Sequence, residues 1–274
     1  MKYRFTKIII VLLFVSLFLS VNGQQTRKIS VQACGISFNM IYVPAGTFTM
    51  GATTDEDYDE REHPSHKVTI TKGYYIGETE VTQALWEAVM ENNPSDNVGK
   101  NNPVDNVSWE DCQAFISILN FITGKHFRLP TEAEWEFAAK GGNNSKGYIY
   151  SGSNHLDEVA WYSVNSGDKI HKDQSILFNR EEYNSRTHEV KLKKPNELGI
   201  YDMSGNVCEW CEDGYAEYTS NHQYDPKGIS TNNNKVKKGG DYADRSRNCR
   251  ITHRYGIESD FCVDSDGFRL VLEE

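Results

Sequence analysis

The stretch GIYDMSGNVCEW, residues 199–210, places several oxygen donors close together. They are the Asp202 side chain, the peptide carbonyls near Gly205 and Val207, and the Glu209 side chain. A hard cation such as calcium takes six or more oxygen ligands. The backbone must then turn tightly around the ion, and the glycines in this stretch permit such turns. The pattern predicts either a calcium site or a polar turn between two strands.

Residues 1–25 differ in composition from the rest of the chain. Three cationic residues precede an apolar run over residues 8–21, and a polar segment follows. This order is typical of a cleaved secretory signal peptide, and the run is short for a membrane span. We therefore expect export to the periplasm or the extracellular space, with an uncleaved anchor as the alternative.

The remaining chain is acidic. The formal net charge of −10 becomes −13 once the three cations of the signal peptide, Lys2, Arg4 and Lys7, are removed. An acidic chain lacks the cations that neutralise phosphates, so neither nucleic acid nor an anionic membrane surface is an expected partner. A protein, peptide or glycan ligand is expected instead. No linker composition or repeat interrupts the chain, which predicts one domain over residues 30–274.

The pattern of apolar residues predicts an α+β fold. Residues 38–52 alternate around Pro44, Ala45 and Gly46 like a hairpin, and residues 67–77 alternate again. Residues 81–91 have helical periodicity. Two further helices are predicted by capping boxes, Ser108 with Asp111 and Thr131 with Glu134. Only short apolar runs follow residue 143, so the second half is predicted to be largely irregular.

The chain has six cysteines, at positions 34, 112, 208, 211, 249 and 262. Six cysteines allow 15 disulfide connectivities, and the sequence does not choose among them. Cys208 and Cys211 have the C-x-x-C spacing of redox pairs. Such a pair normally precedes a helix, whereas the flanking aromatic residues here favour a strand. A redox role for this pair is therefore the less favoured alternative.

Cys249 lies in the basic stretch KKGGDYADRSRNCR, residues 237–250. Nearby cations stabilise a thiolate, so the surrounding arginines make this sulfur the best candidate for reactivity. The alternative is a small buried residue, or one half of a disulfide, beside arginines that pair with carboxylates. Composition alone favours that alternative.

Taken in order, several segments between residues 38 and 271 resemble the formylglycine-generating enzyme (sulfatase-modifying factor) family. They are IYVPAGTFTMG, YYIGETEVTQALW, NPVDNVSWEDCQAF, RLPTEAEWEFAAKGG, KPNELGIYDMSGNVCEW, KKGGDY with CR, and GFRLV. The resemblance implies a variant of the C-type lectin fold, low in regular secondary structure and stabilised by calcium. One family calcium site then falls on Asp202, Gly205, Val207 and Glu209. No residues can be assigned to the second family calcium site, because the sequence departs from the family near residues 160–187.

The resemblance also implies an activity. Enzymes of this family oxidise a cysteine of sulfatases to formylglycine, using dioxygen and copper(I) held by two thiolates. The second thiolate falls on Cys249, but the first falls on Asp244. A carboxylate is a poor ligand for copper(I), so the usual copper site is not expected to assemble. Asp241 replaces a family serine and Cys208 a family tryptophan. These departures predict a non-catalytic member that acts as a binding or assembly module.

Two alternatives retain an enzymatic role. Cys208 could supply the missing thiolate opposite Cys249, which would give a rearranged formylglycine-generating site. The chain could also be another tailoring oxidoreductase of the superfamily, in which Asp241 and Asp244 act as acid and base. If the protein is non-catalytic, Cys249 is expected to pack in the interior or to pair with Cys211.

Overall fold

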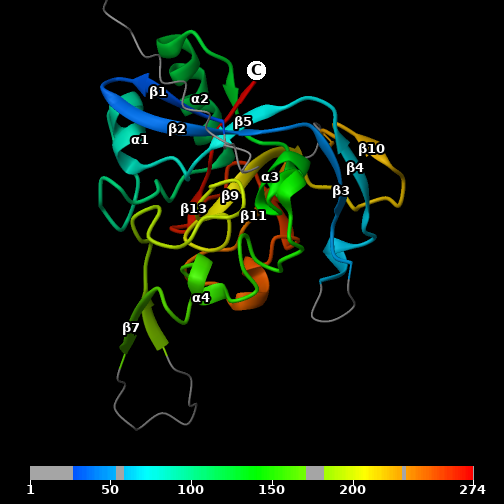
Figure 1. Ribbon diagram of the computed structural model, residues 1–274. Coiled ribbons are helices and arrows are strands. Elements are labelled where there is room, and N and C mark those ends of the chain that lie inside the picture. Colours follow the sequence, from blue (N-terminus) through cyan, green and yellow to red (C-terminus); the bar gives the residue numbers. More distant parts are fainter. Residues whose placement is uncertain (1–26, 54–58, 171–181, 230–232, 274) are drawn as a thin grey trace, which may run out of the picture.

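The computed structural model describes residues 27–53, 59–170, 182–229 and 233–273 (Figure 1). The predicted signal peptide lies outside these ranges. Within them, no helix has both the length and the apolar character needed to cross a membrane.

A five-stranded sheet forms one side of the molecule (Figure 1). Its order is β1-β2-β5-β14-β6, and every neighbouring pair is antiparallel. The strands are β1 Lys28–Ala33, β2 Ile36–Val43, β5 Tyr74–Gly77, β14 Val271–Glu273 and β6 Phe127–Arg128. Because β14 lies between β5 and β6, the end of the described chain is built into the same sheet as its beginning.

The hairpin predicted over residues 38–52 is wrong. β3, Gly46–Met50, pairs with β4, His66–Ile70, in a separate sheet of order β10-β4-β3, whose third strand β10 is Gln223–Tyr224. Two-residue hairpin turns favour positive φ, whereas proline fixes φ near −65°. Pro44 therefore carries the chain from one sheet into the next instead of reversing it.

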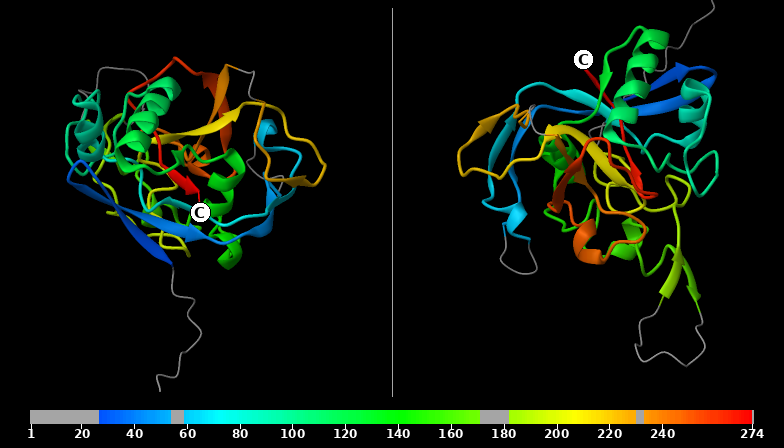
Figure 2. Two further views of the ribbon diagram at one scale, coloured as in Figure 1. Left: turned by 90° about the horizontal axis from the view of Figure 1, so that it is seen from above. Right: turned by 180° about the vertical axis from the view of Figure 1, so that it is seen from behind.

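A four-stranded sheet of order β12-β11-β9-β13 lies at the centre of the fold (Figure 2). Its strands are β9 Cys208–Gly214, β11 Asn234–Lys238, β12 Arg254–Glu258 and β13 Asp266–Gly267. Cys208 and Cys211 thus lie on a strand, as their aromatic neighbours predicted. A two-stranded ribbon of β7, Gly167–Ile170, and β8, Glu182–Ser185, projects from the body of the molecule (Figure 1).

The predicted helices form where their caps placed them. The α-helices are α1 Gln83–Met90, α2 Trp109–Thr123, α3 Glu132–Ala139 and α4 Leu156–Val159, and the 3-10 turns are η1 Glu60–Glu62, η2 Gly142–Asn144 and η3 Ser246–Cys249. Both capping boxes are confirmed: Ser108 with Asp111 begins α2, and Thr131 with Glu134 begins α3. These bonds satisfy amide groups that a helix leaves unpaired at its start.

Two apolar clusters fill the interior. In one, Trp86 of α1 stacks on Phe115 of α2 with 5.2 Å between ring centroids, and Phe268 meets both rings edge-on. In the other, α3 packs through Trp135 and Phe137 against β3, β4 and β9. Helix accounts for 20% of the described residues and strand for 27%, which confirms the predicted α+β class with much irregular structure.

Replacement of Phe115 by alanine tests the first cluster. Phe115 is fully buried, so Phe115→Ala should lower the free energy of unfolding by about 3–5 kcal/mol, as truncation of a buried phenylalanine typically does. Phe121→Ala on the same helix is the matched control, because that side chain is 90% exposed and its loss should change stability little. Urea unfolding monitored by circular dichroism would measure both. Equal losses in the two variants would contradict this packing.

Candidate functional site

The loop of residues 199–207 is held by a buried ion pair. Arg269 donates from Nε and Nη2 to the two carboxylate oxygens of Glu209, at 2.6 Å each. The Trp135 indole donates to Glu209 Oε2 at 2.7 Å. Arg269 also donates to the backbone carbonyls of Gly77 and Tyr201. The guanidinium thus ties β5, β9 and the loop together.

The same region holds more buried negative than positive charge. Asp202 and Glu80 are buried near the Glu209 and Arg269 pair. Burial, followed by the repulsion of Asp202 and Glu209, raises the pKa of Glu80 well above its usual value. The Oδ2 atom of Asp202 accepts a hydrogen bond from the Lys191 amide. The Oδ1 atom is buried and has no hydrogen-bond partner among the described residues.

These observations bear on whether a calcium ion fits here. The free Oδ1 of Asp202 and the excess of carboxylates suit a cation. Glu209 has one acceptor site left on Oε1, since Arg269 and Trp135 use both sites on Oε2. In the described ranges no three His, Cys, Asp or Glu side chains are grouped to hold a metal. An ion here would therefore depend on backbone oxygens such as those predicted at Gly205 and Val207.

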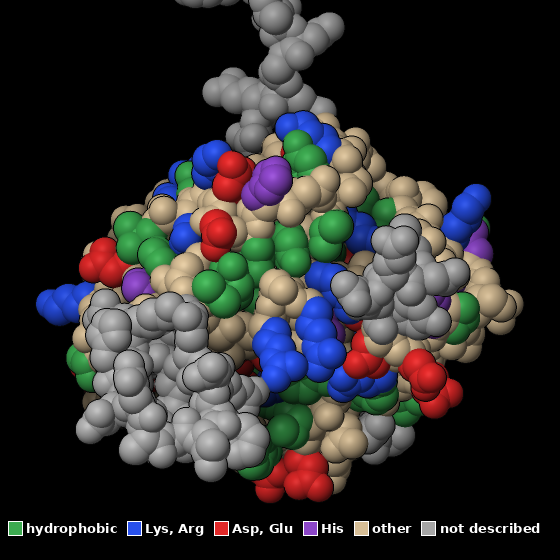
Figure 3. Space-filling model, turned by 90° about the horizontal axis from the view of Figure 1, so that it is seen from below, with side chains coloured by type: hydrophobic (Ala, Val, Ile, Leu, Met, Phe, Trp, Pro, Cys, Tyr) green, Lys and Arg blue, Asp and Glu red, His purple; other side chains and the backbone are tan. Residues whose placement is uncertain are grey.

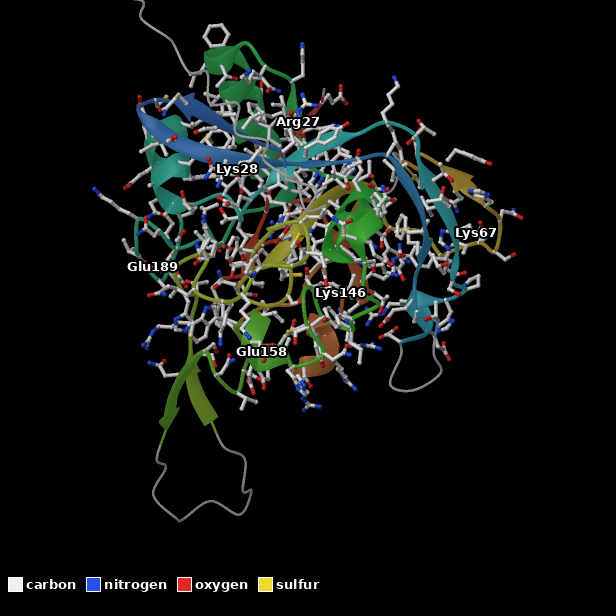
Figure 4. All side chains as sticks on the ribbon, viewed as in Figure 1. Arg27, Lys28, Lys67, Lys146, Glu158 and Glu189 are labelled. Carbon is white, nitrogen blue, oxygen red and sulfur yellow. The ribbon has the colours of Figure 1, made fainter. Side chains whose placement is uncertain are left out.

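Asp244, which the resemblance aligns with the family's first copper thiolate, lines a polar pocket of about 440 Å³. The pocket is lined by Asp59, Arg61, Asp241, Asp244, Arg247, Asn248, Arg250, His253 and Tyr255. It lies beside η3, at the lower end of the molecule in Figure 1. Figure 3 views that end and shows lysine and arginine side chains gathered next to acidic ones. Figure 4 places Glu158 at the same end, and Arg27 and Lys28 at the opposite one.

Asp241 and Asp244 are brought together in this pocket by the turn after β11. The Asp241 amide donates to Asp244 Oδ2 at 3.2 Å, and the Asp244 amide donates to the Asp241 carbonyl. Burial and then repulsion by Asp244 raise the pKa of Asp241 to about 7. Burial also raises the pKa of Asp244. Both carboxyls are therefore easier to protonate than ordinary aspartates.

Neither candidate sulfur lines the pocket. Cys249 is fully buried, and its thiol donates to the Arg245 carbonyl at 3.8 Å. Cys208 is also fully buried, donates to the Lys238 carbonyl at 3.2 Å and accepts from the Tyr255 hydroxyl at 3.2 Å. Tyr255 does line the pocket, so its ring and hydroxyl contact both the pocket and the Cys208 sulfur.

The expectation that the arginines favour a Cys249 thiolate is wrong. Burial raises the pKa of Cys249 well above its ordinary value, and Asp244 and Asp241 raise it further. Two of the nearby arginines are engaged elsewhere, since Arg250 pairs with Glu62 and Arg254 pairs with Glu132, while Arg245 and Arg247 are exposed. Burial likewise raises the pKa of Cys208. A disulfide between Cys249 and Cys211 is also not formed, since all six cysteines are free.

Sequence reasoning missed the residues that complete the pocket from other segments. Asp59, the N-cap of η1, forms an ion pair with Arg61 of η1 at 2.6 Å. Tyr255 lies on β12, and His253 is the residue just before that strand. No local sequence pattern shows that η1 would reach a turn almost 190 residues later, where Glu62 accepts from Arg250 and Thr252.

Comparison with known proteins places these residues in a family. The description "Sulfatase-modifying factor enzyme 1-like domain" matches residues 28–274. The chaperone protein LppX of Paenibacillus barcinonensis is 32% identical over 269 residues, which cover 86% of this chain and 90% of that protein. The formylglycine-generating enzyme of Mus musculus is 27% identical over 291 residues, covering 85% and 75% respectively.

Solved structures agree. Treponema denticola variable protein 1 superposes with a TM-score of 0.77 and 32% identity, covering 90% of this chain and 99% of that one. The predicted fold, the formylglycine-generating-enzyme-like variant of the C-type lectin fold, is thereby confirmed. With the family description matching almost all of the described chain, this protein belongs to the formylglycine-generating enzyme (sulfatase-modifying factor) family.

Proposed function

We propose that this protein is an exported binding or assembly module of the family and not a copper-dependent oxidase. The main observation behind this proposal is the composition of the pocket. Asp244 and Asp241 line it, whereas Cys249 and Cys208 do not. Copper(I) prefers soft thiolates, whereas carboxylates are hard donors. The pocket thus offers charged and hydrogen-bonding groups to a ligand, but no sulfur to a copper ion.

The relative LppX bears on the class of ligand. It is named a chaperone protein, and it shares 32% identity with this chain over most of both lengths. A chaperone binds polypeptide. A polypeptide ligand therefore fits this protein better than a glycan, and a pocket rich in charged side chains suits the polar groups of an extended segment.

The rearranged thiolate site is the less favoured function. It would need Cys208 and Cys249 to bind one copper ion together, yet the hydrogen bonds of each sulfur go to other groups. Each thiol, however, is buried, hydrogen-bonded to a backbone carbonyl and raised in pKa. Copper binding requires both to lose their protons, and burial opposes that loss.

We also propose that calcium stabilises the loop of residues 199–207. The ion would be held by Asp202, by the carbonyls of Gly205 and Val207, and by the remaining acceptor site of Glu209. Support comes from the unpartnered Oδ1 of Asp202 within a buried group of carboxylates that a single guanidinium does not neutralise. A bound divalent cation would supply the missing positive charge.

The oxidase question is settled by a peptide assay. We expect the protein to form no aldehyde on a sulfatase-type C-x-P-x-R peptide in the presence of copper and a reductant. An active formylglycine-generating enzyme under the same conditions is the positive control, and mass spectrometry is the readout. Aldehyde formation that disappears in Cys208→Ser and in Cys249→Ser would instead establish the rearranged thiolate site.

Thiol labelling tests the state of the sulfurs directly. In the native protein at neutral pH, iodoacetamide should label Cys34, which is exposed, and leave Cys208 and Cys249 unmodified. Both are buried, and a raised pKa leaves little of the reactive thiolate. Labelling in denaturant, where all six cysteines should react, controls for detection by peptide mass mapping. Rapid native labelling of Cys249 would show an accessible thiolate and count against a non-catalytic role.

Calcium is tested by thermal unfolding. At calcium concentrations about 100-fold above its dissociation constant, binding adds about 2.7 kcal/mol of stability. We expect a melting temperature roughly 5–10 °C higher in calcium than in a chelator. Asp202→Asn should lose most of this increase, while Asp260→Asn, which changes an exposed aspartate, should keep it. An identical melting temperature with calcium and with chelator would refute the site.

A further inference from the structure

The charges that line the pocket are unevenly matched. Asp59 is paired with Arg61, and Arg250 is paired with Glu62. Asp241 and Asp244 form no ion pair with any described residue. Their side chains accept only from neutral donors: Asp241 from the Ser265 hydroxyl and the Ala243 amide, each at 2.8 Å, and Asp244 from the Asn248 amide at 2.6 Å and the Asp241 amide at 3.2 Å.

These bonds hold the two carboxylates in place without neutralising them. Each bond comes from a group on the turn itself or from Ser265, so the positions of the carboxylates do not depend on a long flexible partner. Lys237 and Arg247 act on Asp244 through space, but Lys237 is paired with Asp266, and Arg247, which lines the pocket, is exposed and forms no ion pair with Asp244. Acidic groups that are held in position without a paired cation form a favourable binding site for a cationic group.

His253 gives a second and independent indication of a ligand. Its side chain lines the same pocket and is only 5% exposed, and its Nδ1 is buried with no hydrogen-bond partner among the described residues. Burial, and then the nearby cations Lys238, Arg61 and Arg250, lower the pKa of His253 to about 3, so the ring is neutral. A buried polar atom without a partner is costly, and a ligand in the pocket would remove that cost.

We propose that this pocket binds the cationic side chain of an arginine or lysine in a polypeptide ligand. Asp241 and Asp244 receive the guanidinium or ammonium group, and His253 forms a hydrogen bond with the same ligand. This inference rests on the proposed polypeptide-binding function and names the residue type that the site selects.

The dimensions and chemistry of the pocket favour a side chain. A volume of about 440 Å³ lies within the range of sites for organic ligands and far exceeds the space of a single ion. Guanidinium groups bind carboxylates through two parallel hydrogen bonds, and two neighbouring carboxylates offer enough acceptors for several such bonds. A bound cation also offsets the mutual repulsion that contributes to the raised pKa of Asp241.

Four pools of acetylated, amidated hexapeptides provide the test. Each pool fixes one residue at the third position, namely arginine, lysine, citrulline or glutamate, and randomises the others. Citrulline has the shape of arginine without its charge. Competition against a fluorescent arginine peptide measures affinity for the full mature protein and for four variants, Asp241→Asn, Asp244→Asn, His253→Phe and the exposed control Asp260→Asn.

We expect the affinity of the arginine and lysine pools to be at least about tenfold higher than that of the citrulline pool. A hydrogen bond to a charged group typically contributes this much. Asp241→Asn and Asp244→Asn should lose this preference while retaining the weaker citrulline binding, and Asp260→Asn should keep it. His253→Phe should weaken the arginine and citrulline pools alike. Circular dichroism of each variant confirms that it is folded.

Other outcomes separate the two proposals. If all pools bind equally, or if Asp244→Asn keeps the preference for arginine, the cationic-side-chain site is wrong and polypeptide binding still stands. If no pool binds, and an unfolded reduced protein does not bind either, the polypeptide-binding function itself fails. If magnesium, calcium or zinc binds to the wild type and not to Asp244→Asn, the pair is a metal site and our inference is overturned.

Discussion

The bonds between Arg269 and Glu209 are the constraint on which the rest of this structure depends. Both side chains are fully buried, so each would be costly to hold in the interior without the other. Arg269 also donates to the backbone carbonyls of Gly77 and Tyr201, and Trp135 of α3 donates to Glu209 Oε2. The Arg269–Glu209 pair therefore joins β5, β9, α3 and the glycine-containing loop. A domain with this much irregular structure needs such fixed points, because sheet ladders alone connect little of its second half.

The sequence predicted the features of the fold that depend on neighbouring residues, and it failed for those that depend on residues far along the chain. Ser108 and Thr131 were correctly predicted to begin helices, because a capping box lies within one turn and its geometry is set locally. Residues 38–52 were predicted wrongly, since alternation shows which face of a strand is buried but not which strand it will pair with. β2 instead pairs with β1, which precedes it, and with β5, which follows some 30 residues later.

The candidate site shows the same limit. The family resemblance placed Asp241, Asp244 and Cys249 near one another, and the structure agrees. Nearness along the chain, however, gave the wrong pKa shift for Cys249. Arg250 and Arg254 pair with Glu62 and Glu132, while the sulfur turns inward to a backbone carbonyl. A cation lowers a thiol pKa only if it lies near the sulfur in space. The direction of a side chain at a tight turn cannot be read from its position in the sequence.

The two aspartates are best understood as a single change. Replacing only the family's first copper thiolate with Asp244 would remove the metal site and leave one isolated acid. Asp241, in place of a family serine, sets a second acid beside it, and both are steadied by neutral donors such as Ser265 and Asn248. Two neighbouring carboxylates repel each other, so the pair by itself lowers stability. A rigid scaffold can carry that cost, and the repulsion becomes useful when a cationic ligand relieves it. The proposed function and the proposed cation site together amount to the loss of a redox centre and the gain of a charge-selective pocket through few changes around one turn.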